Sequence, residues 1–112
     1  NTTSVAAFQG AGSSIIYGAS KAALGAITKS LARAFGKDNI RVNAIAPGFV
    51  DTGFVDWPSG AKEKAIAGSP MGRIPTVDDA ANAVLYLACD ATGVTAQTIF
   101  VDCGVTALLP TV

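Results

Sequence analysis

The chain has 112 residues and a mass of 11.2 kDa, which is enough for one domain and too little for two. Its eight basic and eight acidic residues give a net charge of zero, and the basic residues are scattered, so a nucleic-acid-binding surface is not expected. Half of the residues are hydrophobic and only 14% are charged, against about a quarter in an average soluble domain, so we expect apolar surface that needs covering.

Three further classes of protein are not expected. The longest charge-free apolar runs, such as residues 80–89, fall short of the roughly 18 residues that a membrane-spanning helix needs. The first ten residues lack the basic start and apolar run of a signal peptide. Cys89 and Cys103 do not make a disulfide framework and match no zinc pattern. We expect a soluble chain in a reducing, cytoplasmic setting whose partners are small molecules or proteins.

The first half of the chain predicts a strand, a helix and a second strand. Residues 1–6 are rich in β-branched side chains and indicate the end of a strand. Residues 17–35 predict a helix, because apolar side chains recur there at three- and four-residue spacing. The members of this apolar face are Leu24, Ile27, Leu31 and Phe35. Residues 40–46 predict a buried strand that ends at the Pro-Gly pair 47–48.

The second half continues the alternation. Thr76 predicts the start of a helix, because the sequence TVDD offers a side-chain cap followed by acidic residues in the first turn. We expect the inner face of this helix to consist of Ala80, Ala83, Val84, Leu87 and Ala88. Residues 98–101 predict a short strand. Strands that alternate with helices in this way predict an α/β fold with a parallel sheet covered on both faces.

The opening of the first helix carries the candidate chemistry. The chain contains no histidine, so Tyr, Lys, Asp and Glu remain as proton carriers. Tyr17 and Lys21 are four residues apart, which makes them neighbours on a helix surface. A free phenol has a pKa near 10, and a cation within about 4 to 6 Å lowers it. Lys21 is therefore placed where it could lower the pKa of the Tyr17 phenol. A Tyr-x-x-x-Lys spacing on its own also arises by chance on helix surfaces.

Five segments, taken in order, resemble the C-terminal half of the short-chain dehydrogenase/reductases. They are NTTSVAA, YGASKAAL, RVNAIAPGFVDT, MGRI and VTAQTIFVD. The resemblance implies the C-terminal half of a Rossmann-like doubly wound parallel sheet, with three strands alternating with helices, and residues 1–112 forming the catalytic half of a single domain. The family's glycine-rich nucleotide-binding turn is not found in these residues. Residues 10–15 begin like such a turn but lack its third glycine and the acidic residue about twenty positions on.

The resemblance also implies a hydride-transfer site. Ser4 precedes Tyr17 by thirteen residues, the spacing of the family's catalytic serine and tyrosine. Tyr17 would exchange a proton with the substrate oxygen, Ser4 would hold that oxygen, and Lys21 would lower the pKa of the phenol and bind the nicotinamide ribose. The Val50 backbone would lie near the carboxamide, and Thr52 would donate to the cofactor. The implied cofactor-binding positions are Tyr17, Lys21, Pro47, Gly48, Val50 and Thr52.

We therefore expect part of an NAD(P)-dependent oxidoreductase that acts on a small alcohol or ketone. The choice between NAD and NADP stays open, no metal is implied, and the 112 residues alone are expected to be inactive. The family's subunit interfaces imply a homo-oligomer, either a dimer or a tetramer. The alternative is a truncated, non-catalytic module derived from the family that keeps only its assembly surfaces. Either hypothesis accounts for the low content of charged residues.

Two regions bear on specificity and strain. Residues 53–70 correspond to the family's variable substrate loop, and their aromatic side chains suggest an apolar-walled pocket, although Trp57 could equally be a packing residue. Ala96 and Cys103 stand where the family usually has glycine. If Ala96 requires a positive φ, its methyl group costs about 1 kcal/mol.

Overall fold

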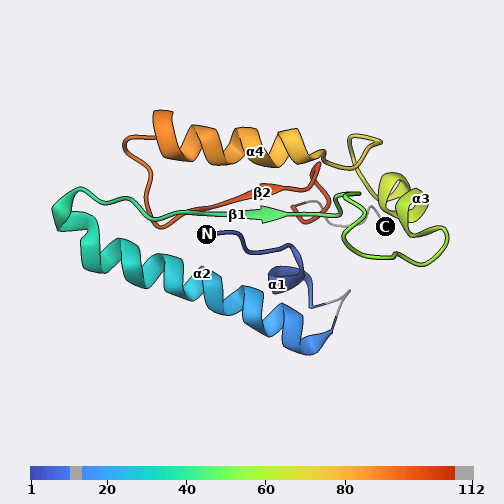
Figure 1. Ribbon diagram of the computed structural model, residues 1–112, viewed down its shortest axis with the longest axis horizontal. Helices are drawn as coiled ribbons and strands as arrows, with labels where there is room; N and C mark the ends of the chain where they lie inside the picture. The colour runs from blue at the N-terminus through green and yellow to red at the C-terminus, as the bar shows by residue number, and fades with distance from the viewer. Residues whose placement is uncertain (11–13, 108–112) are drawn as a thin grey trace.

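The computed structural model describes residues 1–10 and 14–107 (Figure 1). Residues 11–13, which belong to the glycine-containing segment 10–15, lie outside the described residues, as do residues 108–112. In chain order the elements are α1 (Ala6–Gln9), α2 (Ile15–Phe35), η1 (Gly36–Asp38), β1 (Ala44–Pro47), α3 (Ala61–Ala67), α4 (Val77–Leu85), η2 (Tyr86–Asp90) and β2 (Thr98–Val101).

The sheet is parallel throughout the described residues. β1 and β2 pair in parallel, with Ala44 opposite Thr98 and Pro47 opposite Val101. On the other edge of β1, Thr2 forms a parallel bridge with Ile45. Three segments therefore run side by side in the same direction. This confirms the predicted fold class, the C-terminal half of a doubly wound α/β sheet.

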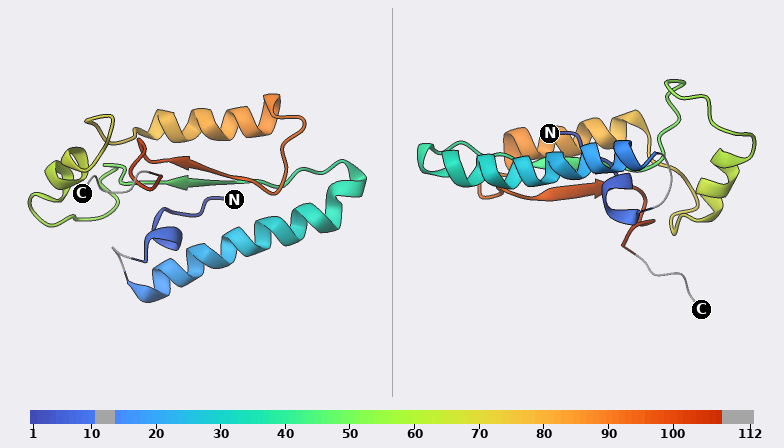
Figure 2. Two further views of the ribbon diagram at one scale, coloured as in Figure 1. Left: turned by 180° about the vertical axis from the view of Figure 1, so that it is seen from behind. Right: turned by 90° about the horizontal axis from the view of Figure 1, so that it is seen from below.

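Helices cover both faces of this sheet (Figures 1 and 2). α4 lies over one face and α2 over the other. On the α4 side, Ile45, Leu87 and Ala91 form a buried apolar cluster. The partly buried side chains packed against it are Ala80, Ala83, Val94, Ile99 and Val101. Burial of this apolar area is what holds α4 on the strands, at about 25 cal/mol for each Å² removed from water.

The face of α2 that packs inward is not the predicted apolar stripe as a whole. Its buried residues are Thr28 and Ala32, whereas Ile27, Leu31 and Phe35 are 37–46% exposed. The small side chains permit close approach to the first segment of the chain, where the Asn1 side-chain amide donates to the Thr28 hydroxyl at 2.8 Å. The apolar periodicity of α2 thus predicted a helix correctly, but it did not identify the face that contacts the sheet.

Several predicted boundaries also shift. α2 begins at Ile15, two residues before the predicted start, because the Ser14 hydroxyl accepts from the Tyr17 amide and caps the helix. β1 begins at Ala44 and not at residue 40, because the Val42 amide bonds to the Thr95 hydroxyl and is lost to the strand ladder. The predicted first strand, residues 1–6, stops short as well, since Ala6 already starts α1.

The second half of the chain follows the prediction more closely. β2 has the predicted bounds, 98–101. The Thr76 hydroxyl accepts from the Asp79 amide at 3.1 Å, and the Asp79 carboxylate accepts from the Thr76 amide at 2.9 Å, so α4 opens with a capping box. Val84 and Ala88 are exceptions to the predicted inner face, because both are exposed and neither belongs to the buried cluster. α3 lies inside the segment that we expected to be a loop.

Two classes of structure are absent from the part of the chain that the structure describes. None of its helices is both long and apolar enough to cross a membrane. Nor does any group of three or more His, Cys, Asp or Glu side chains within residues 1–10 and 14–107 come together as a possible metal site.

Candidate active site

The predicted site residues lie at one edge of the sheet, where the parallel segments end. Ser4 follows the bridging residue Thr2, and the predicted cofactor segment, residues 47–52, begins at the last residue of β1. The Val5 amide donates to the Pro47 carbonyl at 3.1 Å, which joins the two segments directly. The carboxyl ends of parallel strands are where α/β sheets bind their ligands.

Tyr17 and Lys21 lie on the first turns of α2, next to the first segment of the chain. The Lys21 ammonium is 5.7 Å from the centroid of the Tyr17 ring and donates to the Thr2 carbonyl at 3.1 Å. The buried Thr3 hydroxyl donates to the Lys21 carbonyl at 2.7 Å. Both the backbone and the head group of Lys21 are therefore tied to the two residues that precede Ser4.

A close contact between α1 and α2 brings Ser4 towards the same turn of α2. A Cβ atom on Gly18 would lie 3.3 Å from the Ala6 carbonyl oxygen, so a larger residue there would require the two helices to separate by a few tenths of an ångström. The Ser4 hydroxyl oxygen accepts from the Ala6 amide at 3.2 Å. The hydroxyl hydrogen of Ser4 is thus still available for donation to a ligand. No hydrogen bond joins Ser4 directly to Tyr17, whose side chain is partly exposed.

The segment after β1 is held against the end of β2. The Gly48 amide donates to the Val101 carbonyl at 3.0 Å, and a Cβ atom on Gly48 would lie 2.9 Å from the Cβ of Asp102. A glycine is therefore required at this point of the sheet. Val50 is half-buried, and the exposed Thr52 accepts from the Phe54 amide at 3.3 Å, which leaves its hydroxyl hydrogen free to donate.

Asp102, which sequence reasoning did not single out, organises the turn after β2. Its side chain is buried, and its two carboxylate oxygens accept from the amides of Gly104 and Thr106 at 2.9 and 2.8 Å. A buried carboxylate is stable only when its oxygens are hydrogen-bonded. Because Asp102 also contacts Gly48, this turn and the predicted cofactor segment form one packed unit.

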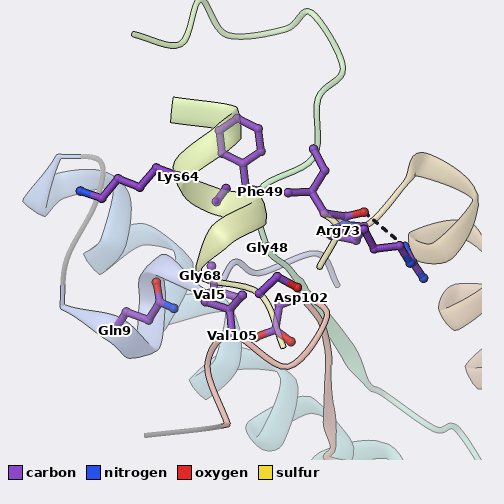
Figure 3. Close-up of a pocket in the computed structure, with 13 residues that line it drawn as sticks. Val5, Gln9, Gly48, Phe49, Lys64, Gly68, Arg73, Asp102 and Val105 are labelled. Carbon is purple, nitrogen blue, oxygen red and sulfur yellow. Dashed lines mark hydrogen bonds between the residues drawn. The ribbon is translucent and has the colours of Figure 1, made fainter. Parts of the chain in front are cut away.

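A cavity of roughly 190 Å³ opens beside these strand ends (Figure 3). Its lining residues come from α1 and the residue before it, the end of β1, α3 and the residues after it, the segment before α4, and the turn after β2. They are Val5, Gln9, Gly48, Phe49, Lys64, Ala65, Gly68, Ser69, Arg73, Ile74, Pro75, Asp102 and Val105. The sequence offered one signal for the α3 wall, the run AKEKAIA, whose residues are mostly strong helix formers. The contributions of Val5 and Val105 carried no local signal.

Two ion pairs lie near the cavity and the loop that precedes α3. The Arg73 guanidinium lies 2.7 Å from the Asp79 carboxylate and, together with the Thr76 amide, lowers the pKa of that carboxyl to about 2. The Lys62 ammonium lies 2.8 Å from the Asp51 carboxylate, and this hydrogen bond raises the pKa of Lys62. Phe49 and Trp57 pack with their ring centroids 4.5 Å apart.

The parallel α/β fold, with the predicted site residues near the carboxyl ends of its strands, has counterparts among known proteins. A family model described as enoyl-(acyl carrier protein) reductase matches residues 1–106. The chain belongs to the short-chain dehydrogenase/reductase family, as the resemblance of its sequence implied, and the matched region corresponds to the C-terminal half of the family's fold.

Two curated relatives illustrate the match. The 3alpha-hydroxysteroid dehydrogenase of Mediterraneibacter gnavus is 46% identical over 104 residues, which are 91% of this chain and 42% of the relative. The 3-oxoacyl-[acyl-carrier-protein] reductase FabG of Thermotoga maritima is 39% identical over 106 residues, which are 93% of this chain and 43% of the relative. The chain thus spans about two fifths of the length of these oxidoreductases.

Solved structures give the same result. A 4-hydroxyisoleucine dehydrogenase complexed with NADH and succinate superposes with a TM-score of 0.87 at 31% identity, over 96% of this chain and 45% of that one. A 3-oxoacyl-[acyl-carrier protein] reductase with bound NAD from Brucella melitensis superposes with a TM-score of 0.86 at 33% identity, over 95% of this chain and 39% of that one.

Proposed function

We propose that this chain is the catalytic half of an NAD(P)-dependent oxidoreductase that interconverts an alcohol and a ketone. The observation that supports the proposal is a pair of hydrogen bonds between Lys21 and the residues before Ser4. The Lys21 ammonium donates to the Thr2 carbonyl at 3.1 Å, and the Thr3 hydroxyl donates to the Lys21 carbonyl at 2.7 Å. These two bonds bring a hydroxyl, a phenol and an ammonium to the carboxyl edge of the sheet, which is the edge that binds ligands in α/β folds.

The donors present fit a nicotinamide nucleotide. Lys21 uses one N–H on the Thr2 carbonyl and has two left for ribose hydroxyls, and Thr52 has a free hydroxyl hydrogen. Within the described residues the Val50 amide forms no hydrogen bond, so it is available to a carboxamide oxygen. When bound, the nicotinamide supplies or accepts the hydride at the substrate carbon.

The residues of the chain then handle the substrate oxygen. Ser4 donates to that oxygen and orients it. Tyr17 gives the oxygen a proton during ketone reduction and takes the proton back during alcohol oxidation. The positive charge of Lys21 stabilises the negative charge that the Tyr17 oxygen carries after it has given up its proton. General acid/base transfer of this kind typically contributes about 10²- to 10⁴-fold in rate.

Replacing Tyr17 with Phe tests the proposal in the protein produced from the complete coding sequence. We expect kcat to fall by at least about 10²-fold, because the proton carrier is lost, while cofactor affinity measured by fluorescence titration changes little. Tyr86→Phe is the matched control, since Tyr86 is exposed to a similar degree (48% against 40% for Tyr17) but lies on η2, and its kcat should be unchanged. Retained turnover in Tyr17→Phe would show that the phenol is not the proton carrier.

A second function is favoured by one observation, the exposed apolar surface of α2. Ile27, Leu31 and Phe35 offer a contact surface suited to another helix. We infer that this surface assembles the protein as a homo-oligomer in the cytoplasm, and a non-catalytic assembly module would use the same surface. Saturable NADH or NADPH binding by the complete protein, followed by its oxidation or reduction with a ketone or alcohol, distinguishes the enzyme from the module.

A further inference from the structure

The cavity beside the strand ends has mainly apolar walls. Val5, Phe49, Ile74, Pro75 and Val105 line it, together with the backbone around Gly68 (Figure 3). A cavity of only about 10 to 15 Å³ already holds one water, so this cavity has room for several waters or for a small organic group. Pockets that combine apolar walls with a few polar groups are the usual sites of small ligands.

The charged residues of the cavity favour an anion. Asp102 is its acidic lining residue, and both carboxylate oxygens already accept from the backbone amides of Gly104 and Thr106. Arg73 is paired with Asp79. Lys64, on α3, forms no ion pair within residues 1–10 and 14–107, and it lies on the same side of the cavity as Gln9 (Figure 3). Figure 3 shows its ammonium at the outer end of the cavity, directed away from Phe49, so it is the charge left to meet a ligand at the mouth of the cavity.

The cavity also adjoins the proposed reaction centre. Val5 follows Ser4 directly, and the Val5 amide donates to the Pro47 carbonyl. Gly48 and Phe49, two further lining residues, belong to the proposed cofactor segment. A substrate whose oxygen contacts Ser4 thus has an apolar recess next to it, with Lys64 on the wall formed by α3.

We propose that the substrate is a small oxo or hydroxy acid. Its reacting carbonyl or hydroxyl contacts Ser4 and Tyr17, its hydrocarbon chain fills the cavity, and its carboxylate pairs with Lys64. The inference rests on the proposed function and names the substrate class for the same site. A single ammonium matches the single charge of a carboxylate, whereas a phosphate dianion recruits several donors, commonly including arginine.

The test compares acids with their neutral esters in the protein produced from the complete coding sequence. The probes are 4-oxopentanoate, 5-oxohexanoate and 6-oxoheptanoate, each compared with its methyl ester. The three acids differ in the number of carbon atoms between the carbonyl and the carboxylate, so the acid with the highest kcat/KM indicates the distance between the two binding positions. We expect kcat/KM for at least one acid to exceed that of its ester. Lys64→Met should lower kcat/KM for that acid about two- to fivefold, the range of an exposed ion pair, and leave the ester unchanged.

Lys62→Met is the matched control. Lys62 lies on the same helix and carries the same charge, but it is paired with Asp51 and does not line this cavity. Its removal should leave the preference for the acid intact. An equal loss in both variants would mean that only the general positive charge of α3 matters, and esters turned over as well as acids would mean that no carboxylate is recognised. Either result overturns the inference.

A binding measurement separates this inference from the proposed function. Trp57, the one tryptophan of this chain, packs against Phe49, which lines the cavity. Hexanoate should therefore change the fluorescence of Trp57, with weaker binding in Lys64→Met than in Lys62→Met and a reduced signal in Trp57→Phe. Hexanoate binding without nicotinamide-dependent turnover of any probe would refute the oxidoreductase and leave the anion site. Turnover of neutral ketones without hexanoate binding would refute only the anion site.

Discussion

The left-handed residues of the last loops show how single positions limit stability. Ala96 has a φ of 60° and Cys103 a φ of 55°, so both sites adopt the conformation that favours glycine. The resemblance to the family had already singled out these two positions, because the family usually has glycine at both. The Ala96 amide donates to the Val42 carbonyl at 2.8 Å, and this bond holds the residue in its strained conformation.

Ala96→Gly should stabilise the protein. Removing the methyl group relieves a left-handed conformation that costs an L-residue roughly 1 kcal/mol, partly offset by the greater freedom of glycine in the unfolded chain. We expect the free energy of unfolding in urea to rise by up to about 1 kcal/mol.

The same substitution at an ordinary helical position supplies the control. Ala81 is exposed within α4, and Ala81→Gly should lower the free energy of unfolding by about 1 kcal/mol. A loss of stability in both variants would mean that the Ala96 methyl makes contacts worth more than its backbone strain.

Among the elements, α4 has the best-defined start, and that start is sensitive to acid. The Asp79 carboxylate accepts from the Thr76 amide and pairs with Arg73, which lowers the pKa of Asp79 from 3.8 to about 2. Since the folded state lowers this pKa, Asp79 stabilises the fold fully above pH 3.8, and the contribution is lost as the pH falls through about 2.

Asp79→Asn should therefore lower the midpoint of thermal unfolding at pH 5 to 7, and its difference from the wild type should shrink steadily between pH 4 and pH 2. Asp78→Asn is the control, because Asp78 lies in the same helical turn but forms no ion pair within the described residues. A difference between Asp79→Asn and the wild type that stays constant from pH 7 to pH 2 would contradict the assignment of the cap.

The elements also show which signals in the sequence were sufficient. β2 and the cap of α4 were predicted correctly because each depends on local features, β-branched residues between turns in one case and the TVDD motif in the other. The helix of α2 was predicted correctly, but its inward face was not predicted, because periodicity identifies an apolar stripe and not the surface it meets. In the structure Thr28 and Ala32 pack inward because their small size lets the first segment of the chain approach.

The candidate site likewise has features that the sequence predicted and features that it did not. The order and spacing of Ser4, Tyr17 and Lys21 were visible in the sequence, and their placement at the sheet edge followed from the parallel fold. The contact between Gly18 and Ala6, the role of Asp102 and the cavity under α3 join residues distant in the sequence. Contacts of this kind depend on tertiary packing, so no local pattern predicts them.

For the molecule as a whole, the carboxyl edge of the sheet joins three segments of the chain around Pro47 and Gly48. The Val5 amide donates to the Pro47 carbonyl on one side, and the Gly48 amide donates to the Val101 carbonyl on the other. The nearest atoms to a Cβ placed on Gly48 would be the Cβ and Cα of Asp102, at 2.9 and 3.0 Å. Neither atom belongs to a flexible chain end, so a methyl group there must push the two strand ends apart.

Gly48→Ala should consequently lower the free energy of unfolding by about 1 to 3 kcal/mol, the usual cost of overpacking a fixed contact. It should also weaken cofactor binding in the protein made from the complete coding sequence, because the proposed cofactor segment begins at this residue.

Gly25→Ala is the control. Gly25 lies within α2, and a Cβ there would meet nothing within 4 Å. Because alanine favours the helix, the free energy of unfolding should rise by up to about 1 kcal/mol. Urea unfolding of both variants, with nicotinamide binding followed by fluorescence, measures the two effects. Unchanged stability in Gly48→Ala would show that the turn at Asp102 yields easily, and the edge of the sheet would then not be the rigid unit on which the proposed site depends.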